Sequence, residues 1–301
     1  MAIKTSFTIK DLENLSGIKA GTIRIWEKRY NLFQPSRTES NIRYYDLKNM
    51  KRLLNVAAIN NYGIKISKIA TISEKELIEK VKEIGKDKTA INNSEFLISM
   101  FRFDSRMFNQ TFDKLLEKKS FEEIFFEDFS VLLNHLGALW TCKTIDPVHE
   151  RFISTHIRQK ILTEIEKVQI REPSGSNVAL FLPLNEMHDI GLLFIHYSLL
   201  KKGINSILLG HSVPIEDLKK VVEVFQEIDF ISYFTIEPSK SKVPNYLKEF
   251  EQKILKNSNS KIHLLGRNTS EFKSKSSKVN VYKSIDEVLN YDWGKKNENE
   301  K

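Results

Sequence analysis

Residues 184–191 read LNEMHDIG and place one imidazole, that of His188, between two carboxylates, Glu186 and Asp189. A carboxylate two residues before a histidine can hold the far ring nitrogen and so fix which tautomer the ring adopts. Such a histidine can be a metal ligand, a catalytic base or the axial ligand of a cofactor, and a surface histidine with no role is the fourth interpretation. The helices and strands predicted around His188 distinguish these four interpretations.

The composition predicts a globular protein of two or three domains, because 301 residues with 41% hydrophobic and 29% charged side chains suffice for several cores. No run approaches the roughly 18 apolar residues of a membrane helix, and the first residues, MAIKTSF, lack a signal peptide's apolar segment. We therefore expect a cytoplasmic, nucleoid-associated protein without a membrane partner. A single cysteine, Cys142, excludes an internal disulfide and a cysteine-rich zinc site, and we expect it to fill apolar space.

The basic residues gather near the start of the chain, between residues 19 and 52. Apolar spacing over residues 9–30, broken at Ser16 and Gly17, predicts two helices joined by a tight turn, and residues 31–46 predict a β-hairpin wing. A third helix is expected from Leu47 to about Gly63. A basic helix-turn-helix suits phosphate contacts, with the second helix entering a major groove of double-stranded DNA.

The rest of the chain divides into two regions of different periodicity. Residues 76–172 have helical spacing without strand-like alternation, which predicts a four-helix bundle. From 176 to 295, apolar strands alternate with amphipathic helices, which predicts a Rossmann-like α/β domain with a parallel sheet. The fold class is thus multidomain: a winged helix-turn-helix (residues 1–75), a helical bundle and an α/β domain. Ligands of such sheets bind at the carboxyl ends of the strands, where LNEMHDIG lies.

The segment TIRIWEKRYNLFQPSRTESNIRYYD resembles the DNA-binding domain of MerR-type transcription regulators over about 65 residues. Asn41 stands where the family usually has a wing-tip glycine, and it tolerates positive φ better than most residues. We expect Trp26 to belong to the core. The resemblance implies a dimer or higher oligomer on near-palindromic promoter elements. The candidate DNA-binding residues are Thr22, Arg24, Arg29, Tyr30, Arg37, Arg43 and Tyr45, with Thr22 and Tyr45 donating to phosphate.

The pattern of Glu186, His188 and Gly191 is similar to that of cobalamin-binding modules, five-stranded α/β domains in which the histidine is the lower axial ligand of cobalt. The resemblance implies that His188 binds the cobalt, that Glu186 orients its ring, and that Gly191 leaves room for the nucleotide tail. Ser232 stands at the position of the family's Ser-x-Leu. Of the family's Gly-Gly pair only Gly266 is present, because Leu265 replaces the first glycine, and a leucine there narrows the tail channel.

The predicted bundle resembles the corrin-capping bundle of the cobalamin-dependent light sensors within the MerR family. The motif of that family is a tryptophan, nine residues and then Glu-His. This chain matches it with Trp140 and Glu150, but Arg151 stands in place of the histidine. The resemblance implies that Trp140 and Glu150 cover the upper face of the corrin, and Trp140 as a core residue stays an open alternative. We expect His149 and His156 at the surface or rim of the bundle.

The sequence therefore predicts a non-enzymatic, DNA-binding transcription regulator, expected to be a repressor. Adenosylcobalamin or methylcobalamin, bound between bundle and α/β domain, would control its oligomeric state or DNA affinity, and the control could respond to light. Three alternatives stay open. One is a degenerate, cofactor-free sensor domain that answers to a protein or another ligand. Another is a corrinoid methyltransferase or mutase module. The third is a metal site at His188, which needs further ligands that His149, His156 and His196 do not supply by spacing.

Overall fold

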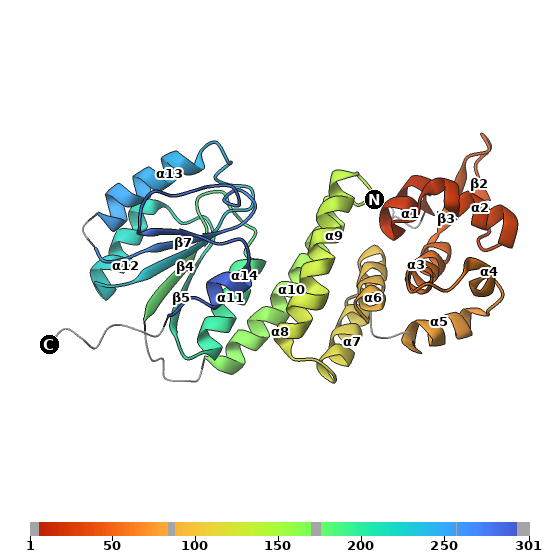
Figure 1. Cartoon of the computed structure of the whole chain (residues 1–301), viewed down its shortest axis with the longest axis horizontal. Helices are drawn as coiled ribbons and strands as arrows, with labels where there is room; N and C mark the ends of the chain where they lie inside the picture. Colours follow the sequence, from red (N-terminus) through yellow and green to blue (C-terminus); the bar gives the residue numbers. More distant parts are fainter. Residues whose placement is uncertain (1–5, 84–87, 170–175, 257, 294–301) are drawn as a thin grey trace. The chain divides into compact units, whose positions relative to one another are not determined.

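The computed structural model describes residues 6–83, 88–169, 176–256 and 258–293 (Figure 1). These residues form two compact units, one within residues 1–156 and one within residues 157–301. The first unit carries the predicted DNA-binding domain and most of the bundle, and the second carries the α/β domain. The long helix α10 (Pro147–Val168) contributes residues to both units.

The first unit begins with the predicted helix-turn-helix, α1 (Ile9–Ser16) and α2 (Ala20–Tyr30). Thr8 caps α1, since its hydroxyl accepts the Asp11 N–H at 3.1 Å and its own N–H donates to the Asp11 carboxylate at 2.9 Å. Gly17 ends the helix at φ 72°, a left-handed conformation that glycine adopts without a Cβ penalty. Ile23 and Trp26 of α2 are buried, so the core position expected for Trp26 is confirmed.

The predicted wing is a small antiparallel sheet in the order β1–β3–β2. Its strands are β1 (Ser6–Phe7), β2 (Ser36–Arg37) and β3 (Arg43–Asp46). At its tip Asn41 has φ 63°, which confirms the turn expected there. Helices α3 (Leu47–Asn61), α4 (Ile66–Ile69) and α5 (Glu74–Glu83) complete this domain.

Phenylalanines form the core of the bundle in the first unit. Phe108 lies 4.8 Å from Phe96 and 6.3 Å from Phe129 between ring centroids. The bundle consists of α6 (Lys88–Arg102), α7 (Ser105–Leu116), α8 (Phe121–Glu123), the π-helical segment η1 (Ile124–Phe129), α9 (Ser130–Thr141) and the start of α10.

Two expectations about single residues of the bundle are wrong. Cys142 is exposed rather than an apolar filler, because it follows the last turn of α9. His149 is 2% exposed and stacks on Phe103 at 5.1 Å, so it belongs to the core and not to the surface. Both residues lie in or next to a connection between helices, where the periodicity of a helix no longer predicts burial.

The second unit is a five-stranded parallel sheet in the order β5–β4–β6–β7–β8. The strands are β4 (Asn177–Phe181), β5 (Asn205–Gly210), β6 (Asp229–Tyr233), β7 (Ile262–Leu265) and β8 (Val279–Val281). All strands run the same way, so their carboxyl ends share one edge, as predicted for a doubly wound domain.

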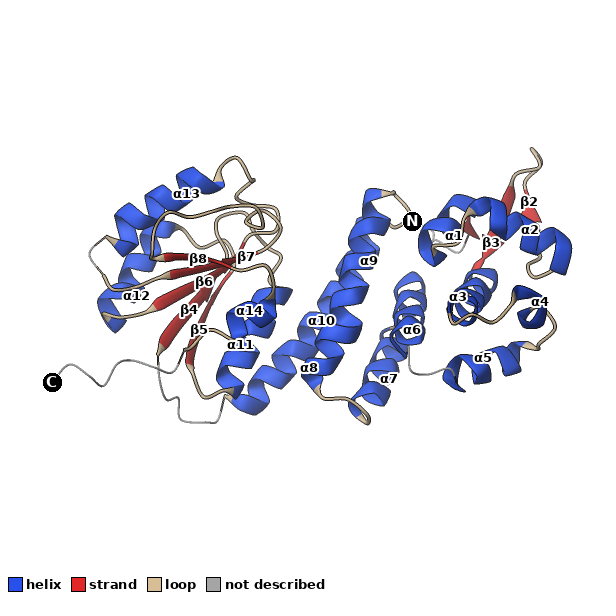
Figure 2. Cartoon of the chain, viewed as in Figure 1, coloured by secondary structure: helices blue, strands red, loops and turns tan. Residues whose placement is uncertain are grey.

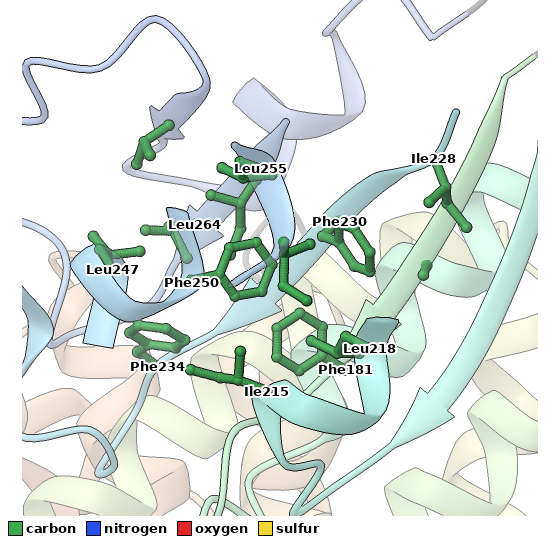
Figure 3. Packing of buried hydrophobic residues seen from close by; sticks show 14 of the residues in the cluster. Phe181, Ile215, Leu218, Ile228, Phe230, Phe234, Leu247, Phe250, Leu255 and Leu264 are labelled. Carbon is green, nitrogen blue, oxygen red and sulfur yellow. The ribbon is translucent and has the colours of Figure 1, made fainter. Parts of the chain in front are cut away.

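Helices cover both faces of this sheet (Figure 2). One face packs on α12 (Leu218–Phe225) and α13 (Val243–Phe250), which the π-helical segment η3 (Glu251–Leu255) extends. Its core is aromatic, with the Phe181 and Phe250 rings stacked at 6.0 Å (Figure 3). The other face packs on α11 (Ile190–Lys201) and α14 (Ile285–Leu289). A short 3-10 helix, η2 (Ile215–Asp217), precedes α12.

Among the helices that the structure describes, none is both long and apolar enough to cross a lipid bilayer.

Candidate functional site

The loop between β4 and α11 is organised by the carboxylate of Glu186, whose side chain is fully buried. Its Oε1 lies 2.6 Å from Nδ1 of His188 and accepts the backbone N–H groups of Met187 and His188 at 2.9 and 3.0 Å. The contact that the spacing predicted between these two side chains is therefore present. It holds the imidazole by Nδ1 and so fixes the orientation of the ring.

The second oxygen of Glu186 ties this loop to the one that follows β6. Oε2 accepts the N–H groups of Thr235, Ile236 and Glu237 at 3.0, 2.6 and 2.9 Å. Burial alone would raise the pKa of Glu186, but the hydrogen bonds from His188 and from the backbone outweigh it and lower the pKa to about 2. Glu186 is thus a permanent anion that fixes two loops at the carboxyl edge of β4 and β6.

The His188 side chain is 49% exposed, and exposed apolar side chains lie on the same two loops. Leu184 and Met187 precede it at 54% and 65% exposure, and Ile236, whose N–H binds Glu186, is 54% exposed. These three large apolar side chains are in solvent and do not belong to the core of the α/β unit.

Asp189 forms an ion pair with another helix of the second unit. Its Oδ2 binds the Arg158 guanidinium of α10 at 2.8 Å, and its side chain is 11% exposed. Burial raises the pKa of Asp189, and Arg158 works against that rise. Glu186 thus contacts the His188 ring, whereas Asp189 joins α11 to α10 inside the second unit.

The residues expected to line a nucleotide-tail channel lie together, but the space between them is filled. A Cβ on Gly191 would lie 2.8 Å from Cε2 of Tyr233, so that ring already covers the glycine. Leu265 is 1% exposed within the apolar cluster under α11. Gly266 has φ 108°, and a Cβ there would lie 2.3 Å from the Phe234 carbonyl oxygen. The expectation that Gly191 leaves room for a tail is corrected by the Tyr233 ring.

Ser232 also has a structural partner. It is fully buried, and its hydroxyl donates to the Phe181 carbonyl oxygen at 2.8 Å, joining the ends of β6 and β4. This hydrogen bond helps to align the two strands whose following loops Glu186 connects.

Trp140 and Glu150 belong to the first unit, whereas His188 belongs to the second. Trp140 is 53% exposed at the end of α9, so it is not a core residue. Glu150 lies half-buried in the first turn of α10, and Arg151 beside it is exposed. An exposed tryptophan on a bundle helix is available to a ligand or to another protein surface.

The described residues hold no group of three or more His, Cys, Asp or Glu side chains that could bind a metal ion. This finding weighs against the multi-ligand metal site considered for His188, which requires several convergent protein ligands. A single axial bond to a metal inside a macrocycle needs only one imidazole.

The candidate DNA-binding surface lies on α2 and the wing. Arg24 and Arg29 are exposed on α2, and Arg37 is exposed on β2, where its guanidinium binds the Asn41 side chain at 2.6 Å. Arg29 also lies over the Tyr30 ring, 5.5 Å from its centroid. These arginines present cations on the helix and the wing that a helix-turn-helix domain directs at DNA. Thr22 and Tyr30 are half-buried on α2.

Glu27 locks the wing onto α2 and changes the roles expected for two residues. Its carboxylate accepts from Nε of Arg43 and from the Tyr45 hydroxyl, both at 2.9 Å. Tyr45 is 0% exposed, so the structure replaces its expected phosphate contact by this internal hydrogen bond. Burial, and next the Glu27 hydrogen bond, raise the pKa of Tyr45 far above its ordinary value. Arg43 keeps 33% exposure beside Glu27.

Sequence reasoning missed the roles of Glu27, Tyr233 and Arg158. Glu27 stands in the sequence as an acid within the basic segment and within the MerR-like motif, and neither pattern predicts that its carboxylate joins α2 to the wing. Tyr233 is the middle residue of the Ser-x-Leu pattern. Its large side chain is the feature of the sequence that indicates that it fills space there. Nothing in the sequence around Arg158 points to Asp189, because the pair joins two elements far apart in the chain.

Residues 7–76 match the family model described as MerR HTH family regulatory protein. The chain is 26% identical over 245 residues to the HTH-type transcriptional repressor CarH of Myxococcus xanthus, covering 78% of this chain and 80% of that protein. It is 24% identical over 234 residues to the HTH-type transcriptional repressor CarA of the same organism, covering 75% of each.

The fold is similar to that of the Methanosarcina barkeri monomethylamine corrinoid protein, a solved structure. It aligns with a TM-score of 0.55 and 12% identity, covering 64% of this chain and 93% of that chain. The first domain is therefore a MerR-type helix-turn-helix domain, and the predicted multidomain architecture is confirmed. At that identity, the match to the corrinoid protein supports the fold and not a ligand.

Proposed function

We propose that this chain is a transcription regulator that binds double-stranded DNA through α2 and the wing. The observation that carries the proposal is the set of exposed arginines, Arg24, Arg29 and Arg37, on a MerR-type domain whose wing Glu27 fixes. The relatives CarH and CarA are named as transcriptional repressors, which supports repression and argues for a regulator rather than an enzyme. A dimer or higher oligomer in the cytoplasm, on a near-palindromic operator, belongs to the same proposal.

The α/β unit is proposed to be the sensor, with a corrinoid as its ligand. Two features of the site fit: an imidazole held by a buried carboxylate, and apolar side chains exposed around it. One feature does not fit, because Tyr233 and Leu265 fill the place of a nucleotide tail. When bound, the cobalt would take its lower nitrogen ligand from His188. Glu186 would hold the proton of Nδ1 and orient the ring.

The finer parts of the proposal concern the signal. Adenosylcobalamin or methylcobalamin as the ligand, a cap formed by Trp140 and Glu150, ligand control of oligomerisation and a response to light belong to the proposal on the strength of the sequence motifs alone. Arg151 in place of a histidine argues for ligand binding without a complete light cycle. The runner-up function is a MerR-type regulator with a cofactor-free sensor, which the filled tail channel favours.

DNA binding is tested by selecting duplexes that bind the full chain from a random library. The affinity of the selected duplex is then measured by titration at several salt concentrations. Replacing Arg24, Arg29 or Arg37 by Ala should weaken binding, and each lost phosphate contact should reduce the salt slope by about one. Lys219→Ala, on the exposed surface of the α/β unit, is the matched control and should bind like the wild type. If the arginine variants bind as tightly as this control, the proposed surface is wrong.

A further inference from the structure

We infer that α2 reads an A·T base pair in the major groove: Ile25 contacts the C5-methyl group of a thymine, and Gly21 lets the duplex approach the helix backbone. Ile25 is then a specificity-determining residue, and Gly21 is a positioning residue. Because this inference names part of the DNA sequence that the α2 surface recognises, it rests on the proposed function.

The helical period of α2 places these two residues on its exposed face. Trp26 is buried and marks the side of the helix that packs on the domain. At about 100° per residue, Gly21 and Ile25 lie side by side at the centre of the opposite face, because residues four apart are neighbours on a helix. Arg24 and Arg29 are exposed at the two margins of that face. The face thus has a small, apolar centre between cations.

Ile25 gives the exposed face an apolar group that the fold does not bury. Its side chain is 58% exposed. In the major groove the base edges lie between two phosphate chains, and the C5-methyl group of thymine is the apolar group that a base edge presents there. Arginines at the margins of the face match the phosphates, and Ile25 at the centre matches the methyl group. An A·T pair is therefore the partner that suits this position.

Gly21 has no role in the fold of the described residues. It lies in the first turn of α2 with a helical backbone, and a Cβ built on it would meet no described atom within 4 Å outside its own helix turn. Neither a left-handed turn nor packing requires a glycine here, although glycine adds entropy to the unfolded chain. A missing side chain does allow another molecule to approach the backbone closely. Such an approach at Gly21 brings Ile25, one turn later, to the base edges.

The charges around Ile25 favour DNA over a second protein surface as the occupant of this face. Exposed cations surround the isoleucine: Arg24, Lys28 and Arg29. The acid of α2, Glu27, is 13% exposed and is held by the Arg43 side chain of the wing. A contact between two copies of this face would bring like charges together, which costs free energy, whereas phosphates attract all three cations.

The test removes single methyl groups from the DNA. The duplex that the full chain selects from the random library is remade with deoxyuridine in place of each thymidine in turn, which deletes only the C5-methyl group. We expect a loss of affinity of about fourfold at one position of each half-site. Ile25→Ala should bind the deoxyuridine and thymidine forms of that position equally. Val224→Ala, which shortens a 74% exposed valine on α12, is the matched control and should keep the fourfold difference.

Gly21→Ala separates positioning from folding. The alanine should slow hydrogen exchange of the α2 amides by about threefold, because it restricts the unfolded chain. It should nevertheless weaken DNA binding by about tenfold, because its methyl group overfills the contact with the duplex. Gly137→Ala, at an exposed glycine of α9 where a Cβ also meets nothing within 4 Å, is the matched control and should leave DNA affinity unchanged.

Equal affinity for all the deoxyuridine duplexes, or a methyl preference that Ile25→Ala retains, would overturn this inference and leave the proposed DNA binding intact. An Ile25→Ala variant that changes the oligomeric state in gel filtration, with the methyl preference unchanged, would place Ile25 on a protein contact instead. If the library yields no duplex that binds the full chain, the inference and the proposed function both fail. The deoxyuridine series on the wild type requires no variant, so a misfolded variant leaves the inference testable.

Discussion

Both candidate sites are organised by one glutamate each, and the two glutamates have different partners. Glu27 joins α2 to the wing through the Arg43 guanidinium and the Tyr45 hydroxyl. Glu186 joins two loops of the α/β unit through the His188 ring and three backbone N–H groups. The first clamp pairs an anion with a permanent cation. The second pairs an anion with an imidazole ring and with neutral backbone dipoles.

The difference matches what each site has to do. A wing that binds phosphate needs a fixed geometry, and an arginine keeps its charge at every physiological pH. A loop that presents an imidazole needs the ring held by one nitrogen and available through the other. Glu186 is also the more deeply buried anion, with 0% side-chain exposure against 13% for Glu27. The α/β unit therefore depends more on its glutamate than the DNA-binding domain does.

The largest effect is expected from Glu186→Ala. It removes the acceptor of five backbone N–H groups and of the His188 ring, so the free energy of unfolding of the second unit should fall by about 4 kcal/mol. Hydrogen exchange of the full chain measures each unit separately, and the amides of residues 235–237 should exchange far faster. Glu237→Ala changes an acid in the same loop without removing this acceptor and is the control. Unchanged exchange at these amides would show that Glu186 does not hold the loop.

Acid should affect the second unit next most strongly. The pKa of Glu186 lies at about 2, below the ordinary glutamate value of 4.5, so its stabilising effect is present above pH 4.5 and is lost as the pH falls towards 2. This shift corresponds to about 3 kcal/mol. Urea unfolding followed by hydrogen exchange between pH 5 and 2 measures it. In Glu186→Gln, the acid-induced loss of unfolding free energy should be smaller by about 3 kcal/mol. Glu27→Gln should show the same acid-induced loss in the second unit as the wild type. Equal acid sensitivity of Glu186→Gln and wild type would contradict the assigned pKa.

The sequence predicts local features of this chain well and contacts between distant elements poorly. Gly17, Asn41 and the burial of Trp26 follow from helix periodicity and turn chemistry, which act over a few residues. The contact between Glu186 and His188 follows from their spacing of two residues. The ring of Tyr233 over Gly191 depends on how α11 packs on β6, and no local pattern encodes it.

Sequence reasoning also did not predict which polar groups at the two sites are buried. The hydroxyl of a tyrosine in a basic wing predicts a phosphate donor, but the Tyr45 hydroxyl instead donates to Glu27 inside the domain. Glu186 was expected to orient a ring, and its three further N–H donors come from a loop about fifty residues later. These contacts are tertiary, so they appear only once the strands are placed side by side (Figure 1).

Glu27→Ala should have an intermediate effect on the first unit. It leaves the buried Tyr45 hydroxyl without its acceptor and releases Arg43, so the free energy of unfolding should fall by about 2 kcal/mol. DNA affinity should also fall, because the wing is no longer fixed to α2. Glu39→Ala, which removes an exposed acid near the wing tip, is the control and should leave stability unchanged. A loss at Glu27 as large as that at Glu186 would erase the difference between the two clamps.

The smallest effect, and the one that separates a clamp from a DNA contact, is expected from Tyr45→Phe. The variant keeps the buried ring and loses only the hydrogen bond to Glu27, so the free energy of unfolding should fall by about 1 kcal/mol. DNA affinity should stay near that of the wild type, measured by titration at fixed salt, because the hydroxyl faces Glu27 and not solvent. Tyr44→Phe, on an exposed wing residue, is the matched control. Unchanged stability with severalfold weaker DNA binding would instead place the Tyr45 hydroxyl on a phosphate.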